Sequence, residues 1–388
     1  GSLSAINSPF EPGSTLKPFT VASVLLHSVA SLADSVDGEK GYWVAGGRPL
    51  RDVHAYGMMT LADALRVSSN IGVAKVAEGL TAGQQFEMLR DFGFGSRTGF
   101  ELQPEVSGHL PRPHRWSRTS PSRLAIGYEI SVTPLQMAMA YGALANGGKL
   151  MQPRIVKELR DPEGRVSFRS RPRVVRQVIP SRVARDISRV LVDVVEDGTG
   201  TQARLATFTV AGKSGTSRAY GAGGYEKGHY ASFVCFFPVE DPQLVIFVKL
   251  DRPEGSYYGG ATAAPVTRAT MEAVLAAHQA PIDWGAMASL DRRQPRNKPS
   301  PGAHFASNTL SSPPPVRTPR TPTQPETGAL VPDVSGLSPR LAVRRLHALG
   351  FRVRLDDFGA VVGTDPPQDT PLSPGDTVRL IVRRAGDG

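Results

Sequence analysis

The stretch FEPGSTLKPF, residues 10–19, carries the first of three short motifs on which the interpretation of this chain depends. Pro12-Gly13 predicts a turn, and we expect a helix to start directly after it at Ser14. Pro18 is compatible with that helix because its missing N–H falls in the first turn, where no partner is lost. Ser14 and Lys17 are three residues apart and therefore share one helix face. The sequence thus places an amine beside a hydroxyl.

Two further motifs follow in order, Ser68-Ser69-Asn70 and Lys213-Ser214-Gly215-Thr216. The second motif lies between predicted helices at 61–67 and 71–79, and the third follows a strand predicted over 208–212. Ser-x-x-Lys alone should occur about once by chance in a chain of this length and composition. All three motifs in this order are the working set of a serine acyltransferase.

The first motif supplies a nucleophile and a candidate base. We expect Ser14 to attack, since its hydroxyl lies at the positive end of the helix and Lys17 is the nearest group that can take its proton. A lysine is a base only when it is neutral, and burial or a second cation such as Lys213 lowers its pKa. The sequence leaves open which of the two lysines gives up its proton.

The second motif supplies a proton relay. We expect Ser68 to carry a proton from Ser14 to the leaving amine, and the amide of Asn70 to hold either a substrate carbonyl or the lysine itself. Taken alone, Ser-Ser-Asn is more typical of a helix cap or a polar helix face. Its place between the other two motifs favours the catalytic interpretation.

The third motif supplies a binding edge. Gly215 in a strand beside a cleft allows a substrate backbone to approach closely. The N–H of Thr216, together with that of Ser14, predicts an oxyanion hole, in which one donor is typically worth ~10²–10³ in rate. We expect Lys213, Ser214 and Thr216 to attract a terminal carboxylate.

Length and composition indicate two domains joined by a linker. A chain of 388 residues is long for one domain. Nine of the 38 residues in 291–328 are proline, and such a segment cannot bury a core. We therefore predict a large domain over 1–285, a Pro-rich linker over 286–328 and a small domain over 329–388, which begins with Val331-Pro332-Asp333-Val334 and contains a helix over 339–349 followed by strands.

The large domain is predicted to be α+β, with helices flanking a mostly antiparallel sheet. Thr133-Pro134-Leu135-Gln136 is a capping box that starts one helix, and Ser181 starts another that ends at Asp197-Gly198. Two apolar strands, 230–237 and 244–250, are separated by a turn signal, and a helix over 263–278 closes the domain.

Composition excludes several functional classes. The net charge is +10, but no basic run is interleaved with aromatic residues, so we expect no nucleic-acid partner. No apolar run reaches the ~18 residues of a membrane helix. The single cysteine, Cys235, lies in a predicted buried strand and is interpreted as a core residue. No His/Glu spacing indicates a metal, and we expect no cofactor.

These residues resemble the penicillin-binding proteins, specifically the transpeptidase domain of the monofunctional class B branch that serves cell division. Beyond the three motifs, four stretches are similar to that family: residues 10–19, SSNIGVAK at 68–75, IGYEISVTPLQM at 126–137 and QPRIV at 152–156. The terminal domain resembles a PASTA module. The implied fold is that of penicillin-binding proteins and serine β-lactamases, followed by a small α/β domain.

The resemblance implies a peptidoglycan D,D-transpeptidase. Ser14 would attack the D-Ala-D-Ala end of a stem peptide, or of its lipid-linked precursor, release D-Ala and pass the acyl group to an amine of a neighbouring stem. β-Lactams would be covalent inhibitors, and a division glycosyltransferase would be a partner. The protein would act on the outer face of the cytoplasmic membrane, with its anchor in an N-terminal part that precedes this sequence.

Two departures from the family and two other functions remain open. Family members have further strands ahead of the nucleophile, so part of the sheet is expected to be missing here. Glu129 stands where relatives often have glycine; it either alters the edge of the active site or is a loop residue, and we favour the loop. A non-catalytic binder of cell-wall peptides or β-lactams would not need both lysines and the serine relay. A D,D-carboxypeptidase or β-lactamase would need a base that activates water, and none stands out.

Overall fold

The computed structural model describes residues 3–221, 224–277, 282–283, 329–337, 339–347, 349–355, 360–373 and 375–383. The chain divides into two compact units, Gly1–Ile282 and Asp283–Gly388, and each is described by itself. The predicted linker, 286–328, lies outside the described residues.

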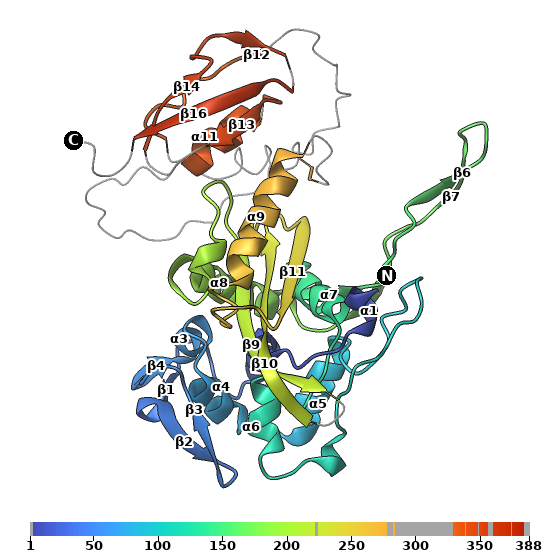
Figure 1. The fold of residues 1–388 in the computed structure, drawn as a ribbon, viewed down its shortest axis with the longest axis vertical. Coiled ribbons are helices and arrows are strands. Elements are labelled where there is room, and N and C mark those ends of the chain that lie inside the picture. The colour runs from blue at the N-terminus through green and yellow to red at the C-terminus, as the bar shows by residue number, and fades with distance from the viewer. Residues whose placement is uncertain are drawn as a thin grey trace, which may run out of the picture. The chain divides into compact units, whose positions relative to one another are not determined.

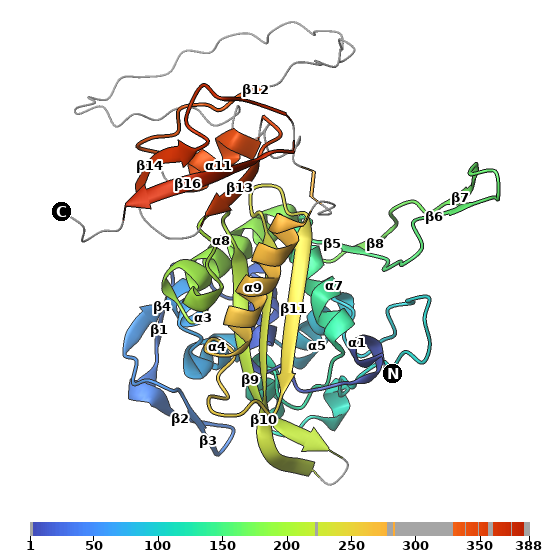
Figure 2. The same ribbon diagram turned by 45° about the horizontal axis from the view of Figure 1, so that its top comes forward.

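The larger unit is built on a three-stranded antiparallel sheet in which β10 lies between β9 and β11. Residues 230–237 of β10 are buried without the alternation of a half-exposed strand, so both faces of the sheet are covered. Helices α7 and α9 both pack against β10 and β11, and Figure 2 shows α9 running alongside the strands of the sheet. The elements are β9 (Ala211–Gly221), β10 (Gly224–Phe237), β11 (Leu244–Asp251), α7 (Pro134–Ala145) and α9 (Ala263–Ala276).

Helix α2 (Lys17–Leu26) runs through the core of this unit. Its first eight residues are all buried, and Phe19 packs against Phe92, Phe94 and Tyr141 with ring centroids 4.6–5.3 Å apart. A helix that is apolar on all sides is a core helix. Any polar residue at its N-terminal end is therefore taken out of water.

The remaining elements of the larger unit surround this core (Figure 1). The helices α3 and α4 flank the second motif, and α8 packs against β9. Helices are α1 (Ser4–Asn7), α3 (Leu61–Arg66), α4 (Asn70–Ala77), α5 (Ala82–Asp91), α6 (Ser120–Ala125) and α8 (Ser181–Asp197). Short 3-10 turns are η1 (Gly13–Leu16), η2 (Glu39–Gly41), η3 (Pro113–Arg115) and η4 (Thr201–Ala203).

Eight short strands form four antiparallel pairs outside the main sheet: β1 with β4, β2 with β3, β5 with β8, and β6 with β7. Their bounds are β1 (Ser35–Asp37), β2 (Tyr42–Ala45), β3 (Arg48–Arg51), β4 (Met58–Thr60), β5 (Lys149–Met151), β6 (Glu158–Arg160), β7 (Val166–Arg169) and β8 (Val174–Gln177). The β6–β7 pair extends away from the rest of the unit (Figure 1).

The smaller unit is a compact α/β module. Strand β16 lies between β13, with which it is parallel, and β14, with which it is antiparallel. Its apolar core includes Val334, Leu346, Phe351 and Val378. The elements are β12 (Ala329–Leu330), α11 (Pro339–His347), β13 (Arg352–Leu355), β14 (Ala360–Asp365), β15 (Pro371–Leu372) and β16 (Thr377–Arg383).

Several predictions about single elements are confirmed. The capping box is present, since Thr133 and Gln136 each accept the other's backbone N–H at the start of α7. Helix α8 spans Ser181–Asp197 as expected. Cys235 is buried, and this burial raises the pKa of its thiol to about 12, as for an inert core residue. Glu129 lies in the loop between α6 and α7.

Two predicted boundaries are wrong. The helix expected from Ser14 starts at Lys17, because Gly13 has a φ of +54° and the residues after it form the 3-10 turn η1. The strand expected over 208–212 starts at Ala211. The reason lies in the neighbouring strand β10, which ends at Phe237, just before a proline that has no N–H. The last residue pair between β10 and β9 is Phe236–Ala211, so residues before Ala211 have no strand to pair with there. The third motif therefore lies inside β9.

Neither membrane helices nor metal groups are found in the described ranges. None of the helices there is long and apolar enough to cross a bilayer. Within the same ranges, no three His, Cys, Asp or Glu side chains gather into a group that could hold a metal ion.

Candidate active site

The turn that carries Ser14 packs directly on the strand of the third motif. A Cβ on Gly13 would lie 2.7 Å from the carbonyl oxygen of Thr216, and one on Gly127 would lie 2.0 Å from the carbonyl oxygen of Gly13. Both positions have positive φ, so glycine is required for conformation as well as for space. The turn is further fixed because the N–H of Gly13 donates to the oxygen of Gly127 at 3.0 Å.

Lys17 lies one 3-10 turn after Ser14 with its side chain fully buried. Its Nζ donates to the backbone oxygen of Ser68 at 2.6 Å and to Oδ1 of Asn70 at 2.8 Å. It also lies 3.3 Å from Oγ of Ser68. The first two oxygens can only accept, so a neutral amine would satisfy both with its two protons and keep its lone pair.

The second motif forms the turn between α3 and α4. Ser68 has a φ of +64°, a left-handed conformation that costs a non-glycine residue about 1–2 kcal/mol. This conformation lets both the carbonyl oxygen and the hydroxyl of one residue face Lys17. Ser69 is the N-cap of α4 and accepts the N–H of Gly72 at 2.8 Å. The three residues thus have different tasks, and only Ser69 has the capping role.

Lys213 reaches the same serine from β9. Its Nζ donates to Oγ of Ser68 at 2.8 Å, and it is also fully buried. Residues that are 51 and 145 positions from Ser68 therefore meet on one oxygen. The structure brings together Lys17, Ser68, Asn70 and Lys213, all expected from the sequence to share a site.

Burial changes the ionisation of both lysines. It lowers the pKa of Lys17 to about 7, against an opposing effect of the Asp52 carboxylate. Burial also lowers the pKa of Lys213 well below its usual range, and the charge of Lys17 lowers it further. The site therefore holds fewer protons at neutral pH than two ordinary lysines would.

Ser14 itself makes no side-chain hydrogen bond in the described part of the chain, although its backbone oxygen accepts the N–H of Lys17. Catalytic hydrogen bonds are often long in unliganded structures and tighten only with substrate. Ser14 is partly exposed.

Asp52 supports the second motif, and sequence analysis did not identify it. Its carboxylate accepts from Oγ of Ser69 at 2.5 Å, from the N–H of Asn70 and from the N–H of Ile71 at 3.2 Å. A carboxylate at the first turn of a helix is stabilised by the unpaired N–H groups there. Nothing in the local sequence shows that a residue from the loop after β3 caps α4.

Gly215 faces the turn of Ser14, and protein atoms fill the space that a side chain on it would occupy. A Cβ there would meet Oγ of Ser232 at 2.5 Å, Cγ2 of Thr15 at 2.8 Å and the oxygen of Pro12 at 2.9 Å. Packing is therefore one reason for this glycine, and the approach of a substrate stays a prediction. The glycine permits η1 to pack against β9, which sets the distance between the two motifs.

The hydroxyls of the third motif keep protons available for an anion. Oγ1 of Thr216 accepts the N–H of Gly259 at 3.1 Å, so its own proton is free to be donated. Oγ of Ser214 pairs with Oγ1 of Thr199 at 2.8 Å, which uses one of their two protons. Thr199, another residue missed from the sequence, thus extends the row of hydroxyls.

Comparisons with known proteins identify the family of both domains. Residues 2–272 match the family model of the penicillin binding protein transpeptidase domain, and residues 330–384 match that of the PASTA domain. The chain belongs to the penicillin-binding protein transpeptidase family. Its fold class, α+β with a C-terminal PASTA domain, is the one expected from the sequence.

Relatives and solved structures lie in the class B branch. The chain is 36% identical over 264 residues to stage V sporulation protein D of Bacillus subtilis, covering 67% of this chain and 41% of that protein. It is 35% identical over 291 residues to penicillin-binding protein PbpB of Mycolicibacterium smegmatis, covering 72% and 45%. Penicillin-binding protein 3 of Mycobacterium tuberculosis, complexed with aztreonam, superposes with a TM-score of 0.64 at 30% identity, covering 70% and 63%.

The chain spans about half the length of the curated relatives that it matches. A further structure, the transpeptidase domain of penicillin-binding protein 3 from Burkholderia pseudomallei, covers 76% of this chain and 83% of that one, with a TM-score of 0.63 and 29% identity.

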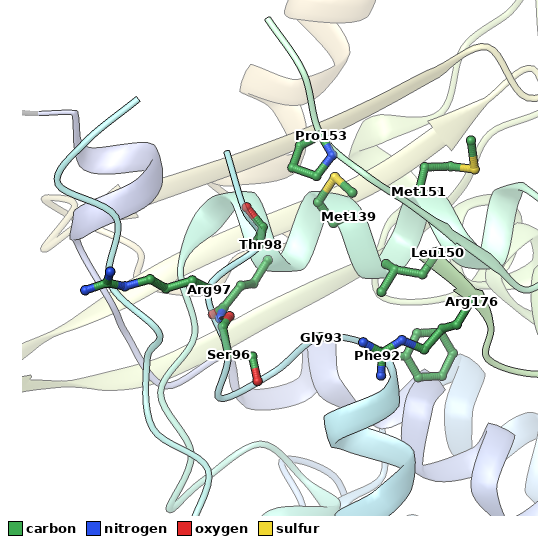
Figure 3. Close-up of a pocket in the computed structure, with 11 residues that line it drawn as sticks. Phe92, Gly93, Ser96, Arg97, Thr98, Met139, Leu150, Met151, Pro153 and Arg176 are labelled. Carbon is green, nitrogen blue, oxygen red and sulfur yellow. Dashed lines mark hydrogen bonds between the residues drawn. The ribbon is translucent and has the colours of Figure 1, made fainter. Parts of the chain in front are cut away.

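A small pocket lies apart from the lysine pair of this penicillin-binding domain. Phe92, Met139, Leu150 and Arg176 are among its lining residues (Figure 3). Its free volume is about 50 Å³, whereas pockets for small molecules usually have ~300–1,000 Å³. It shares no residue with the three motifs, so we assign it no part in acyl transfer.

Proposed function

We propose that this protein is a peptidoglycan D,D-transpeptidase in which Ser14 is the nucleophile. The observation that carries the proposal is the convergence of two fully buried lysines on Oγ of Ser68, beside the turn of Ser14. Burying one lysine lowers the stability of the fold, and burying two beside one hydroxyl lowers it further. Two apolar side chains in the same place would stabilise the fold more. Such a pair of lysines is typical of proton transfer.

Lys17 is the general base in this proposal. Its pKa of about 7 leaves a large neutral fraction at neutral pH, and it is three residues from Ser14. Ser14 Oγ attacks the carbonyl carbon of the penultimate D-Ala while its proton passes to Nζ of Lys17. When the C–N bond breaks, Ser68 gives its hydroxyl proton to the departing amine of D-Ala. It then regains a proton from the lysines that it contacts.

Asn70 positions the base. Its Oδ1 accepts from Lys17, and its Nδ2 donates to the backbone oxygen of Arg51 at 2.8 Å. Of the two roles left open by the sequence, holding the lysine is the one that this geometry supports.

The edge of β9 forms the binding site for the donor peptide. The N–H groups of Ser14 and Thr216 would stabilise the oxyanion. The terminal carboxylate would accept the hydroxyl proton of Thr216 and the one proton that the Ser214–Thr199 pair does not use between themselves. Lys213 would add positive charge when it holds the shared proton. The acceptor is an amine of a second stem peptide, which attacks the ester and restores Ser14.

β-Lactams would acylate the same serine. Penicillin-binding protein 3 of Mycobacterium tuberculosis was solved in complex with aztreonam and with ampicillin. We place the protein in the cell envelope, at the outer face of the cytoplasmic membrane, with lipid-linked peptidoglycan precursor as substrate and a division glycosyltransferase as partner. The proposed domain limits are 1–285 for the transpeptidase, 286–328 for the linker and 329–388 for the PASTA domain.

Intact-mass spectrometry after incubation with a penicillin tests this proposal. We expect one stable adduct on the peptide that contains Ser14, and none in the Ser14→Ala variant. The matched control is Ser167→Ala, which changes an exposed serine of β7. A folded protein that gains no adduct, or an adduct that persists in Ser14→Ala, would refute the assignment. The first of these results would favour a non-catalytic binder of cell-wall peptides.

A further inference from the structure

A buried carboxyl group lies three residues before the nucleophile. The side chain of Glu11 is buried at 7% exposure, and its Oε2 has no hydrogen-bond partner among the described residues. A buried acceptor without a partner is costly, on the order of 1–3 kcal/mol. The mechanism described above does not use this group.

Glu11 connects three segments of the chain. Its Oε1 accepts the backbone N–H of Glu129 at 2.9 Å and lies 3.4 Å from the hydroxyl of Tyr225 on β10. Its backbone oxygen accepts the hydroxyl of Ser217 on β9 at 2.6 Å. The residue thus ties the nucleophile turn to the loop at 126–130 and to the β9–β10 hairpin.

The conformation of the loop at 126–130 depends on the hydrogen bond between Glu129 and Glu11. Glu129 has a φ of +61°, a left-handed conformation that costs about 1–2 kcal/mol in a non-glycine residue. The bond from its N–H to Glu11 and the bond from Ser120 Oγ to its own carboxylate at 2.6 Å offset that cost. Gly127 in the same loop packs against Gly13, so the loop conformation is transmitted to the turn of Ser14.

The surroundings of Glu11 shift the pKa of its carboxyl group upward. Burial raises its pKa, and the charge of Glu129 adds to this effect. The N–H of Glu129, the hydroxyl of Tyr225 and the charge of Arg123 on α6 act in the opposite direction. Tyr128 also faces the carboxyl group, and Arg218 of β9 lies over the Tyr225 ring. Glutamine has the same length as this residue and keeps an oxygen that can accept from the Glu129 N–H and the Tyr225 hydroxyl.

We propose that Glu11 is a positioning residue for acyl transfer: by holding the 126–130 loop and Tyr225 against the nucleophile turn, it fixes Ser14 relative to the Thr216 N–H. The inference rests on the proposed function of Ser14. Gly13 lies so close to Thr216 that a Cβ on it would be 2.7 Å from the Thr216 carbonyl oxygen, so a shift of the turn displaces the nucleophile from the oxyanion site. A displacement of about 1 Å can cost ~10²-fold in rate.

The test compares Glu11→Gln with Glu11→Ala in acylation by a fluorescent penicillin. Rates measured over a range of penicillin concentrations separate the reversible binding constant from the rate constant of acylation. We expect Glu11→Ala to lower the acylation rate constant by ~10–100-fold with little change in reversible binding. Glu11→Gln should keep at least a third of the original rate constant, because its amide oxygen accepts the same bonds. Tyr225→Phe should fall between them.

Glu226→Gln is the matched control. Glu226 follows Tyr225 on β10 and forms an ion pair with Arg252 at the surface. This variant should acylate as the original chain does. Glu11→Ala acylating at the original rate, or folded Glu11→Gln acylating more than tenfold slower, would overturn the inference. If Glu11→Ala does not fold, the rate of Glu11→Gln decides alone. Failure of the original chain to form an adduct would instead contradict the proposed function.

Discussion

Basic side chains occur in two very different surroundings in this molecule. One is the buried pair Lys17 and Lys213, and the other is the exposed β6–β7 arm, residues 154–173. Lys17 and Lys213 are fully buried, and their pKa values are lowered by loss of water. Lys157 and the arginines of the arm are exposed, and Arg160 and Arg165 form surface ion pairs with Glu158 and Asp161. A basic residue becomes a proton acceptor through burial, and its presence in the sequence alone does not indicate this role.

The largest expected effect comes from removing the base. Lys17→Met keeps most of the buried volume but removes the amine, so acylation by a penicillin should fall ~10²–10⁴-fold, the usual range for a general base. Lys157→Met makes the same change in the exposed arm and should leave the rate unchanged. Equal rates in the two variants, measured by gel fluorescence over time, would refute the role of Lys17.

Ser68→Ala is expected to have the next largest effect. It removes the oxygen on which Lys17 and Lys213 converge and leaves both amines without that partner. Acylation should fall ~10²-fold, because proton transfer to the leaving group loses its relay. Ser69→Ala changes the adjacent serine and should retain the adduct, with stability lowered by about 1 kcal/mol through loss of the α4 cap. Loss of the adduct in Ser69→Ala alone would reverse the two assignments.

Asp52→Asn tests the support of the second motif. The side chain keeps an oxygen for the cap but loses the charge that raises the Lys17 pKa. The pKa of Lys17 should therefore fall, and the loss of acylation at acid pH should move to lower pH. A pH–rate profile measures this shift against the original chain. An unchanged profile would show that Asp52 acts only as a helix cap.

The smallest effect is expected in the arm. Glu158→Gln removes the partner of Arg160 and Arg169 at the surface. Surface ion pairs contribute little, so neither the acylation rate nor the unfolding midpoint in urea should change measurably. A slower acylation would show that the arm contributes to the reaction.

The same contrast explains what could be predicted from the sequence. Lys17, Ser68 and Lys213 could be predicted as site residues because each belongs to a short motif. Each motif combines, at a fixed local spacing, residue types that acyl transfer needs. The capping box at Thr133 and the apolar strand at 230–237 are likewise local signals, and the structure contains both.

The rest depends on contacts between distant segments. Asp52, Thr199 and Glu11 act through residues that are 15 to 118 positions away, and no local pattern marks them. The helix start at Lys17 was misplaced because Gly13 takes a positive φ to pack against Thr216, a tertiary requirement. The packing role of Gly215 could not be predicted for the same reason, since its neighbours Thr15 and Ser232 come from other elements.

The ionisation of Lys17 is the central claim, and NMR of the lysine side-chain signals as a function of pH tests it most directly. The resonance assigned by its absence in Lys17→Met should titrate with a pKa of about 7, and acylation should be lost as the pH falls through that value. The lowered pKa means that the neutral, basic form is present above pH 7 and the inactive ammonium form below it. A Lys17 that stays charged up to pH 9 would contradict the account.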